Sequence, residues 1–102
     1  MYVDDVVDGF VRAATKGGGL VCNIGTGQET SVNTLFREMA TQAGAQVEPE
    51  FKALRVGELA RNCLDPTRAR IQLGWNPWTE LGTGTAATIE FVRDRLTEAG
   101  EL

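Results

Sequence analysis

The chain has 102 residues, of which 42% are hydrophobic and 24% are charged, and this ordinary globular composition does not predict disorder. A net charge of −4 argues against a general nucleic-acid surface, and no apolar run approaches the roughly 20 residues that span a bilayer. Histidine is absent, which excludes Ser-His-Asp and Cys-His catalysis and histidine metal sites. We expect residues 1–102 to form a single domain.

The amino-terminal segment is acidic and does not read as a secretory signal, so we expect a cytoplasmic protein. Cys22 and Cys63 form no Cys-x-x-Cys motif, and we therefore expect no metal site. One disulfide between them is possible. Two reduced thiols, each at least partly buried, are the expectation for a cytosolic chain.

A first helix is predicted over residues 4–16, before the glycines at 17–19. Its apolar residues fall on one helical stripe: Val6, Val7, Phe10, Val11 and Ala14. Residues 20–24 are mostly apolar and precede a glycine, which predicts a short strand. This first part of the chain therefore predicts a helix followed by a strand.

A second helix is predicted from Ser31 or Val32 to Ala43, capped by Thr30 or Ser31 and ended by Gly44. Its apolar positions have the clearest helical period in the chain: Val32, Leu35, Phe36, Met39, Ala40 and Ala43. Residues 47–51 then alternate between apolar and charged side chains. That alternation predicts a half-buried strand, and its proline places the strand at a sheet edge.

A short third helix is predicted to start at Asp65-Pro66 and to end near Leu73. Trp75 and Trp78 are expected to attach the following turn to the core. The final helix opens at Thr79 and Glu80, and its buried stripe is predicted to comprise Leu81, Thr85, Ile89, Val92 and Leu96. Four helices and two or three short strands make a small, partial α/β fold.

Gly25-Thr26-Gly27 lies between a predicted strand and a predicted helix, a position that can hold a phosphate on backbone N–H groups. The nucleotide fingerprint requires a third glycine where Thr30 stands. The sequence therefore favours a plain turn over a phosphate site. No paired catalytic carboxylates can be identified from the spacing, so no catalytic residue is assigned.

Basic side chains gather between residues 50 and 70, where five of them face three carboxylates, a local charge of +2, while the rest of the chain carries −6. The five are Lys52, Arg55, Arg61, Arg68 and Arg70. Such a segment suits a diphosphate. On charge alone, a solvated surface with ordinary ion pairs is the favoured interpretation.

Several segments, in order, resemble the NAD-dependent sugar-nucleotide epimerases and dehydratases, which are extended short-chain dehydrogenases of the UDP-glucose 4-epimerase kind. Residues 2–9 read YVDDVVDG as in that family, and residues 22–27 resemble its YNIGTG. Residues 31–35 resemble the helix start that follows, and residues 55–58 its RxGD/E motif. Residues 65–69 and 73–77 resemble D-x-S-K-A and LGW-x-P. The resemblance covers residues 2–95.

The resemblance is to the carboxy-terminal, substrate-binding part of such an enzyme, without its Rossmann domain. In the family, the amino-terminal part carries the glycine-rich NAD fingerprint and the catalytic Tyr-x-x-x-Lys pair, and this chain has neither. The resemblance therefore implies no catalytic residue and no cofactor bound by this chain alone, although complete members use NAD. It also implies a sugar nucleotide such as UDP-glucose as ligand.

By resemblance, Arg55 matches the arginine that grips the substrate diphosphate. Glu58 matches the acid of the same motif and is expected to order the loop. Asn62 stands where some epimerases have a tyrosine that contacts substrate, and Asn23 lies in the strand motif. The substrate-binding candidates are therefore Arg55, Asn62 and Asn23, with Asn23 expected mainly to hold its loop.

Three hypotheses follow. The first is a detached substrate-binding domain without catalysis of its own. The second is a subunit of a split epimerase that is completed by a separate NAD-binding chain. The third is a binding or structural module that self-associates as a homodimer through exposed apolar surfaces.

Overall fold

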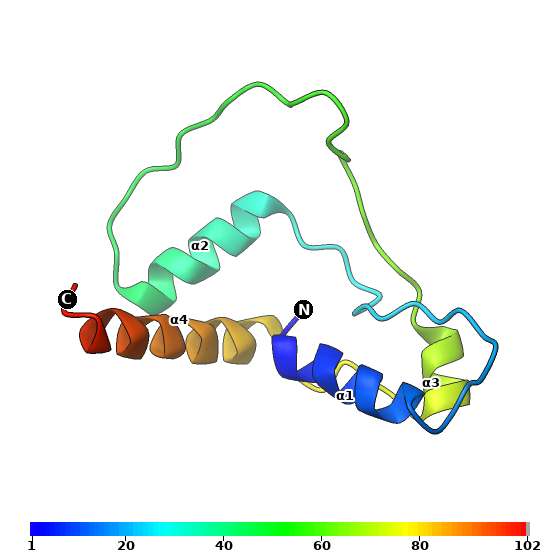
Figure 1. The fold of residues 1–102 in the computed structure, drawn as a ribbon. Helices are drawn as coiled ribbons and strands as arrows, with labels where there is room; N and C mark the ends of the chain where they lie inside the picture. The colour runs from blue at the N-terminus through cyan, green and yellow to red at the C-terminus, as the bar shows by residue number, and fades with distance from the viewer. Residues whose placement is uncertain (102) are drawn as a thin grey trace. The chain divides into compact units, whose positions relative to one another are not determined.

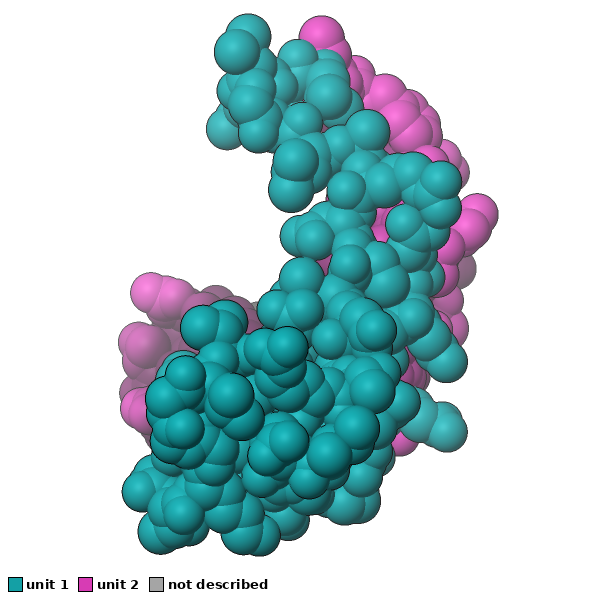
Figure 2. Space-filling view, turned by 90° about the vertical axis from the view of Figure 1, so that its right-hand side faces the viewer, with its two compact units in different colours: residues 1–29, 54–80 teal, residues 30–53, 81–102 magenta. Residues whose placement is uncertain are grey.

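The computed structural model describes residues 1–101. In chain order its helices are α1 (Val3–Ala13), α2 (Val32–Ala43), α3 (Thr67–Leu73) and α4 (Leu81–Glu98) (Figure 1). The chain divides into two compact units, which Figure 2 distinguishes by colour. Unit 1 comprises residues 1–29 and 54–80, and unit 2 comprises residues 30–53 and the chain from residue 81 onward. The single-domain organisation of residues 1–102 stays a prediction.

The core of unit 1 is built on Trp75, whose side chain is fully buried together with Ala69 and Leu73 of the α3 region. Cys22 and Ile24 pack partly against this cluster. The indole Nε1 of Trp75 donates to the backbone oxygen of Asp5 in α1 at 2.7 Å. This buried hydrogen bond satisfies the only polar atom of the tryptophan side chain and attaches the core to α1.

The apolar stripe of α1 does not face this core. Asp5 and Gly9 are the buried residues of α1, whereas Phe10 is 74% exposed and Val11 is 66% exposed. The Asp5 carboxylate accepts hydrogen bonds from the backbone nitrogen of Thr79 at 3.0 Å and from its hydroxyl at 3.2 Å. The helix therefore packs within unit 1 through a glycine and a hydrogen-bonded carboxylate.

Arg12 attaches α1 to the carboxy-terminal end of α3. Its guanidinium donates to the backbone oxygens of Leu73 at 3.3 Å and Gly74 at 3.0 Å, and it pairs with Asp8 at 3.0 Å. A cation is favourable there because the last carbonyls of a helix lack partners. The guanidinium also lies 5.8 Å from the ring centre of Trp78. Trp78 is 58% exposed, so of the two tryptophans only Trp75 lies in the core.

Unit 2 consists of α2 packed against α4, with an extended segment after α2. Of the two predicted caps of α2, Ser31 is the one observed, because its hydroxyl accepts from the backbone nitrogen of Thr34 at 3.0 Å. Gly44 ends α2 in the left-handed conformation. Arg93 of α4 donates to the backbone oxygen of Ala43 at 2.8 Å, which joins the two helices at the end of α2.

The predicted α/β fold class is wrong, because residues 1–101 contain four helices and no strand. Residues 20–24 keep a strand-like alternation, with Cys22 and Ile24 half-buried and Val21 82% exposed, yet they form no ladder. In residues 47–51 only Pro49 is half-buried. A strand requires a hydrogen-bonded neighbour, and neither segment has one within residues 1–101. The described helices include none that is long and apolar enough to cross a membrane.

Candidate functional site

Arg55 lies in a tight turn that Glu58 holds. The backbone nitrogen of Arg55 donates to Glu58 Oε2 at 2.9 Å, and the backbone nitrogen of Glu58 donates to the Arg55 oxygen at 3.1 Å. Gly57 adopts a φ of +88° in this turn, a conformation that favours glycine. Glu58 therefore orders the loop. The Arg55 guanidinium makes no hydrogen bond or ion pair within residues 1–101, and its residue is exposed.

A bidentate ion pair anchors the segment that follows. Arg61 donates to both carboxylate oxygens of Glu29, from Nε at 3.0 Å and from the second terminal nitrogen at 2.6 Å. The hydrogen bond to Glu29 raises the pKa of Arg61 above its usual value. Because the forked geometry of a guanidinium matches a carboxylate, this exposed pair gives a defined connection between residues 54–64 and the loop after Gly27. Asn62 is exposed beside it.

Asn23 serves the fold of this region. Its side-chain nitrogen donates to the backbone oxygen of Asp65 at 3.4 Å. A Cβ on Gly25 would lie 2.9 Å from Leu64 Cβ, so only glycine allows this close approach of the two segments. Hydrogen bonds from Thr67 lower the pKa of Asp65 and order the turn before α3. The sequence predicts Asp65 as the cap and Pro66 as the first helical residue, whereas in the structure Pro66 is the N-cap and α3 begins at Thr67.

The Gly25-Thr26-Gly27 loop is held by hydrogen bonds between its own residues and Gln28. Thr26 Oγ1 accepts from the backbone nitrogen of Gln28 at 3.2 Å and donates to the Gln28 oxygen at 3.0 Å. A Cβ on Gly27 would lie 3.4 Å from Pro66 Cδ, so the loop is also backed by the segment before α3. α2 starts only at Val32, and its Thr34 amide is already bound by Ser31. These contacts support a plain turn over a phosphate cradle.

The three predicted substrate residues all belong to unit 1, but no hydrogen bond or ion pair joins any two of them within residues 1–101. The basic segment around them is partly neutralised. Arg61 pairs with Glu29, Lys52 lies 3.8 Å from Glu50, and Arg68 donates to the backbone oxygen of Val21 at 3.1 Å. Of the five basic residues, Arg55 and Arg70 are both exposed and have no such partner in the described chain, and Arg55 is the one that lies in the ordered turn.

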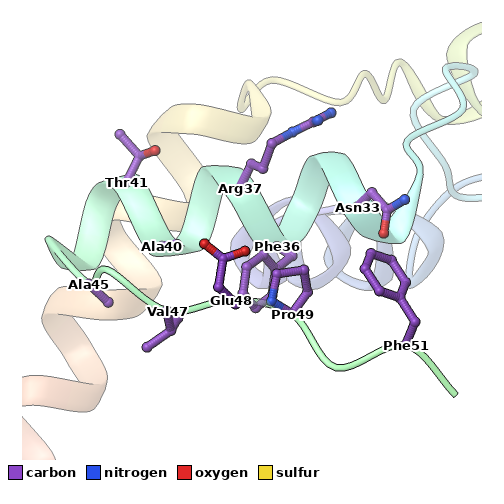
Figure 3. A pocket seen from close by; sticks show the side chains of 10 residues that line it. All are labelled: Asn33, Phe36, Arg37, Ala40, Thr41, Ala45, Val47, Glu48, Pro49 and Phe51. Atoms are coloured by element: carbon purple, nitrogen blue, oxygen red, sulfur yellow. The ribbon is translucent and has the colours of Figure 1, made fainter.

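Sequence reasoning did not identify a groove in unit 2. Side chains of α2 and of the extended segment after it line an open cavity of about 430 Å³ (Figure 3). Phe36 and Arg37 contribute from the helix, and Glu48, Pro49 and Phe51 contribute from the segment. None of the three predicted substrate residues lines this groove. The alternation of residues 47–51 is the available signal in the sequence, and it favours a strand instead of a groove.

The two cysteines are free, with Cys22 half-buried and Cys63 exposed. The expectation that both thiols are at least partly buried is therefore wrong for Cys63. Among residues 1–101, no three side chains of the histidine, cysteine, aspartate and glutamate types are grouped so that they could hold a metal ion.

Comparison with known proteins shows which enzymes this chain is similar to. The chain is 51% identical, over 96 residues, to a UDP-glucose 4-epimerase from Mycolicibacterium smegmatis, and 36% identical to a dTDP-glucose 4,6-dehydratase from Streptomyces griseus. It superposes with a TM-score of 0.90 and 42% identity on a crystal structure of a UDP-glucose 4-epimerase with UDP-glucose from Thermotoga maritima. The chain therefore corresponds to one part of a sugar-nucleotide epimerase or dehydratase.

The match extends over nearly all of this chain but over a minor part of its relatives. It covers 93% of this chain and 31% of the Mycolicibacterium epimerase, and 87% of this chain and 28% of the Streptomyces dehydratase. For the Thermotoga structure the shares are 94% and 31%. No family model matches the chain. The chain thus spans about a third of the length of these family members.

Proposed function

We propose that this chain is the substrate-binding part of a sugar-nucleotide epimerase and that it holds the diphosphate of its ligand through Arg55. The observation that carries the proposal is the Arg55 turn. Glu58 fixes its backbone, and the guanidinium is left exposed and unpaired within residues 1–101. A guanidinium fork binds phosphate oxygens in a bidentate manner, which suits a nucleoside diphosphate.

Two neighbouring features support the proposal. The Arg61–Glu29 pair holds the segment that carries Arg55 and Asn62, so the cation is presented on an anchored loop. A structural relative of this chain was crystallised with UDP-glucose, which is a nucleoside diphosphate sugar. In this proposal Asn62 donates or accepts a hydrogen bond at the ligand. Asn23 positions the loop through Asp65.

The chain does not carry out the epimerase chemistry by itself in this proposal. Family members use NAD, but the residues present do not fit a dinucleotide. The one candidate glycine loop is closed by Thr26 and Gln28 and is backed by Leu64 and Pro66. No Tyr-x-x-x-Lys pair occurs in the sequence. The chain's own contribution is therefore to bind and orient the diphosphate, and we propose that it does so in the cytoplasm.

Two alternatives remain proposals as well. A separate NAD-binding chain would complete a split epimerase, and a homodimer would cover the exposed apolar side chains. The core of unit 1 consists of only three buried hydrophobic side chains. Phe10, Val21 and Ile71 of the same unit, and Phe51 of unit 2, are all more than 70% exposed. Exposed apolar surface on this scale favours association with another protein surface over a free monomer.

Isothermal titration of the chain with UDP-glucose tests the role of Arg55. We expect binding by the wild type and about a 10- to 100-fold weaker affinity for Arg55→Ala, because a charge-assisted hydrogen bond contributes about 1.5–3 kcal/mol. Arg95→Ala is the matched control, since Arg95 is exposed on α4 and its partner is Glu98 at 3.9 Å. Equal affinities of the wild type and Arg55→Ala would refute the assignment.

A further inference from the structure

The segment of residues 54–64, which carries Arg55, has no buried residue and forms no helix or strand. Burial therefore does not hold it in place. Among the described residues, two hydrogen bonds join this segment to another part of unit 1, and both run from Arg61 to Glu29. The other hydrogen bonds of the segment close the turn between Arg55 and Glu58. The pair with Glu29 is therefore the hydrogen-bonded connection of the Arg55 turn to the rest of its unit.

Glu29 is suited to hold that segment because its own loop is ordered. It follows Gln28, whose backbone nitrogen and oxygen both bond to the Thr26 hydroxyl, at 3.2 Å and 3.0 Å. The Glu29 side chain is 45% exposed, against 80% for that of Arg61. Two parallel bonds from one guanidinium to one carboxylate fix the orientation of the planar group. The less exposed partner, on the ordered loop, thus fixes the more exposed partner on the segment.

We propose that Glu29 is a positioning residue of the sugar-nucleotide site, and that it acts through Arg61 on Arg55 without touching the ligand. This inference rests on the proposed function, because it takes Arg55 to bind the diphosphate. Arg55 stands six residues before Arg61, and the next close contact lies nine residues on, where Leu64 meets Gly25. A flexible tether spreads over about 13 Å for six residues and about 16 Å for nine, so the volume open to the Arg55 turn about doubles without the pair.

The effect of removing the Glu29 carboxylate separates this positioning role from a direct role of Arg61. If Arg61 itself bound the phosphates, Glu29 would compete with the ligand for the same guanidinium, and its removal would strengthen binding. In the positioning role the Arg61 charge is already compensated by Glu29, and Arg55 is the cation of the segment that is left for the diphosphate. Removal of the carboxylate then weakens binding, because the turn that carries Arg55 is no longer held.

Isothermal titration of the whole chain and of Glu29→Gln with UDP-glucose measures this effect. We expect the variant to bind about two- to fivefold more weakly, because the tether is longer and an exposed ion pair is lost. Glu50→Gln is the matched control and should bind like the wild type. Glu50 is also exposed, but its partner Lys52, at 3.8 Å, stands only two residues away in the chain. Unchanged or tighter binding by Glu29→Gln, or equal losses in both variants, overturns the proposal.

A double-mutant cycle shows whether Glu29 and Arg61 act as one unit. Arg61→Lys keeps the positive charge but lacks the guanidinium fork, so we expect it to lose about as much affinity for UDP-glucose as Glu29→Gln. The double variant should bind about as well as either single variant, because each change alone already breaks the bidentate contact. Losses that multiply in the double variant would show independent contributions and contradict the proposal.

Two further measurements separate positioning from folding. The free energy of unfolding in urea should be the same for Glu29→Gln and Glu50→Gln, because both ion pairs are exposed. Heteronuclear NOE values measured without UDP-glucose should fall at residues 54–62 in Glu29→Gln alone, because only there does the segment lose its connection. Wild-type values in this segment contradict the proposal, and so does a Glu29→Gln variant that is less stable than the control.

The titrations also distinguish failure of this inference from failure of the proposed function. A wild-type chain that does not bind UDP-glucose, or an Arg55→Ala variant that binds it as tightly, refutes the proposed function and the positioning role with it. A wild type that binds, an Arg55→Ala variant that binds weakly and a Glu29→Gln variant that binds like the wild type refute the positioning role alone.

Discussion

Gly9 has no side chain at the point where α1 lies against Trp75. A Cβ there would lie 3.2 Å from Ile24 Cδ1 and 3.4 Å from Trp75 Nε1, and that nitrogen is held by its hydrogen bond to Asp5. A valine would place two further methyl groups in this contact. The position therefore determines how closely the helix approaches the core of unit 1.

We expect Gly9→Val to lower the free energy of unfolding by about 1–3 kcal/mol, as overpacking usually does. Gly18→Val is the matched control, since a Cβ at Gly18 would meet nothing within 4 Å. Urea unfolding followed by tryptophan fluorescence measures both variants, because Trp75 and Trp78 both report on unit 1. A Gly9→Val variant as stable as the control would show that α1 is not held at this distance.

Asp8 makes part of the stability of unit 1 dependent on pH. The hydrogen bond from Trp78 at 3.1 Å, together with Arg12, lowers the pKa of the Asp8 carboxyl below its ordinary value of 3.8. A carboxyl whose pKa is lower in the folded state stabilises the fold above its unfolded pKa. That stabilisation is lost as pH falls through the folded pKa.

The stability difference between wild type and Asp8→Asn should therefore be constant from about pH 7 to pH 5 and should shrink as the pH falls below about 4. Urea unfolding at a series of pH values measures it. Asp4→Asn is the control, because Asp4 is an exposed residue of the same helix, one turn earlier. A difference for Asp8→Asn that does not vary with pH would show that the contact with Trp78 is absent in solution.

Among the elements, the helices were predictable because the residues that determine where each one forms lie within it or directly beside it. The spacing of apolar residues, the Ser31 cap and the glycines at 44 and 74 lie within each helix or beside it, and both glycines adopt the left-handed conformation. The strands were not predictable in the same way. An alternating pattern such as residues 20–24 shows that a segment suits a sheet, but a strand also needs a partner that the segment does not encode.

The cap of α2 gives a test at this scale. We expect Ser31→Ala to lower the free energy of unfolding by about 1 kcal/mol, because the Thr34 amide loses its acceptor. Thr30→Ala, one residue earlier and outside the observed cap, should have little effect. Far-UV circular dichroism during urea unfolding measures both variants, because it reports on all the helices, including α2, whereas neither tryptophan lies in unit 2. A larger effect at Thr30 would assign the cap to the other residue.

At the scale of the whole molecule, the candidate site was only partly accessible from sequence. Arg55 was identified through its motif and its basic surroundings, and Glu58 was expected to order the loop, as its hydrogen bond to the Arg55 backbone shows. The Arg61–Glu29 pair was not foreseen, because its residues are 32 positions apart and no local pattern connects them. The outward face of α1 was missed for a related reason. A stripe on a helix shows that a face is apolar, but not which neighbour covers it.

In the proposed function, this chain binds the sugar nucleotide but not the cofactor of its family. Amide NMR spectra of the labelled chain alone, with UDP-glucose and then with NAD distinguish the two ligands residue by residue. We predict chemical-shift changes with UDP-glucose that centre on the Arg55–Glu58 turn, and none with NAD. A dispersed spectrum that neither ligand changes, or one that changes with NAD, would contradict the claim.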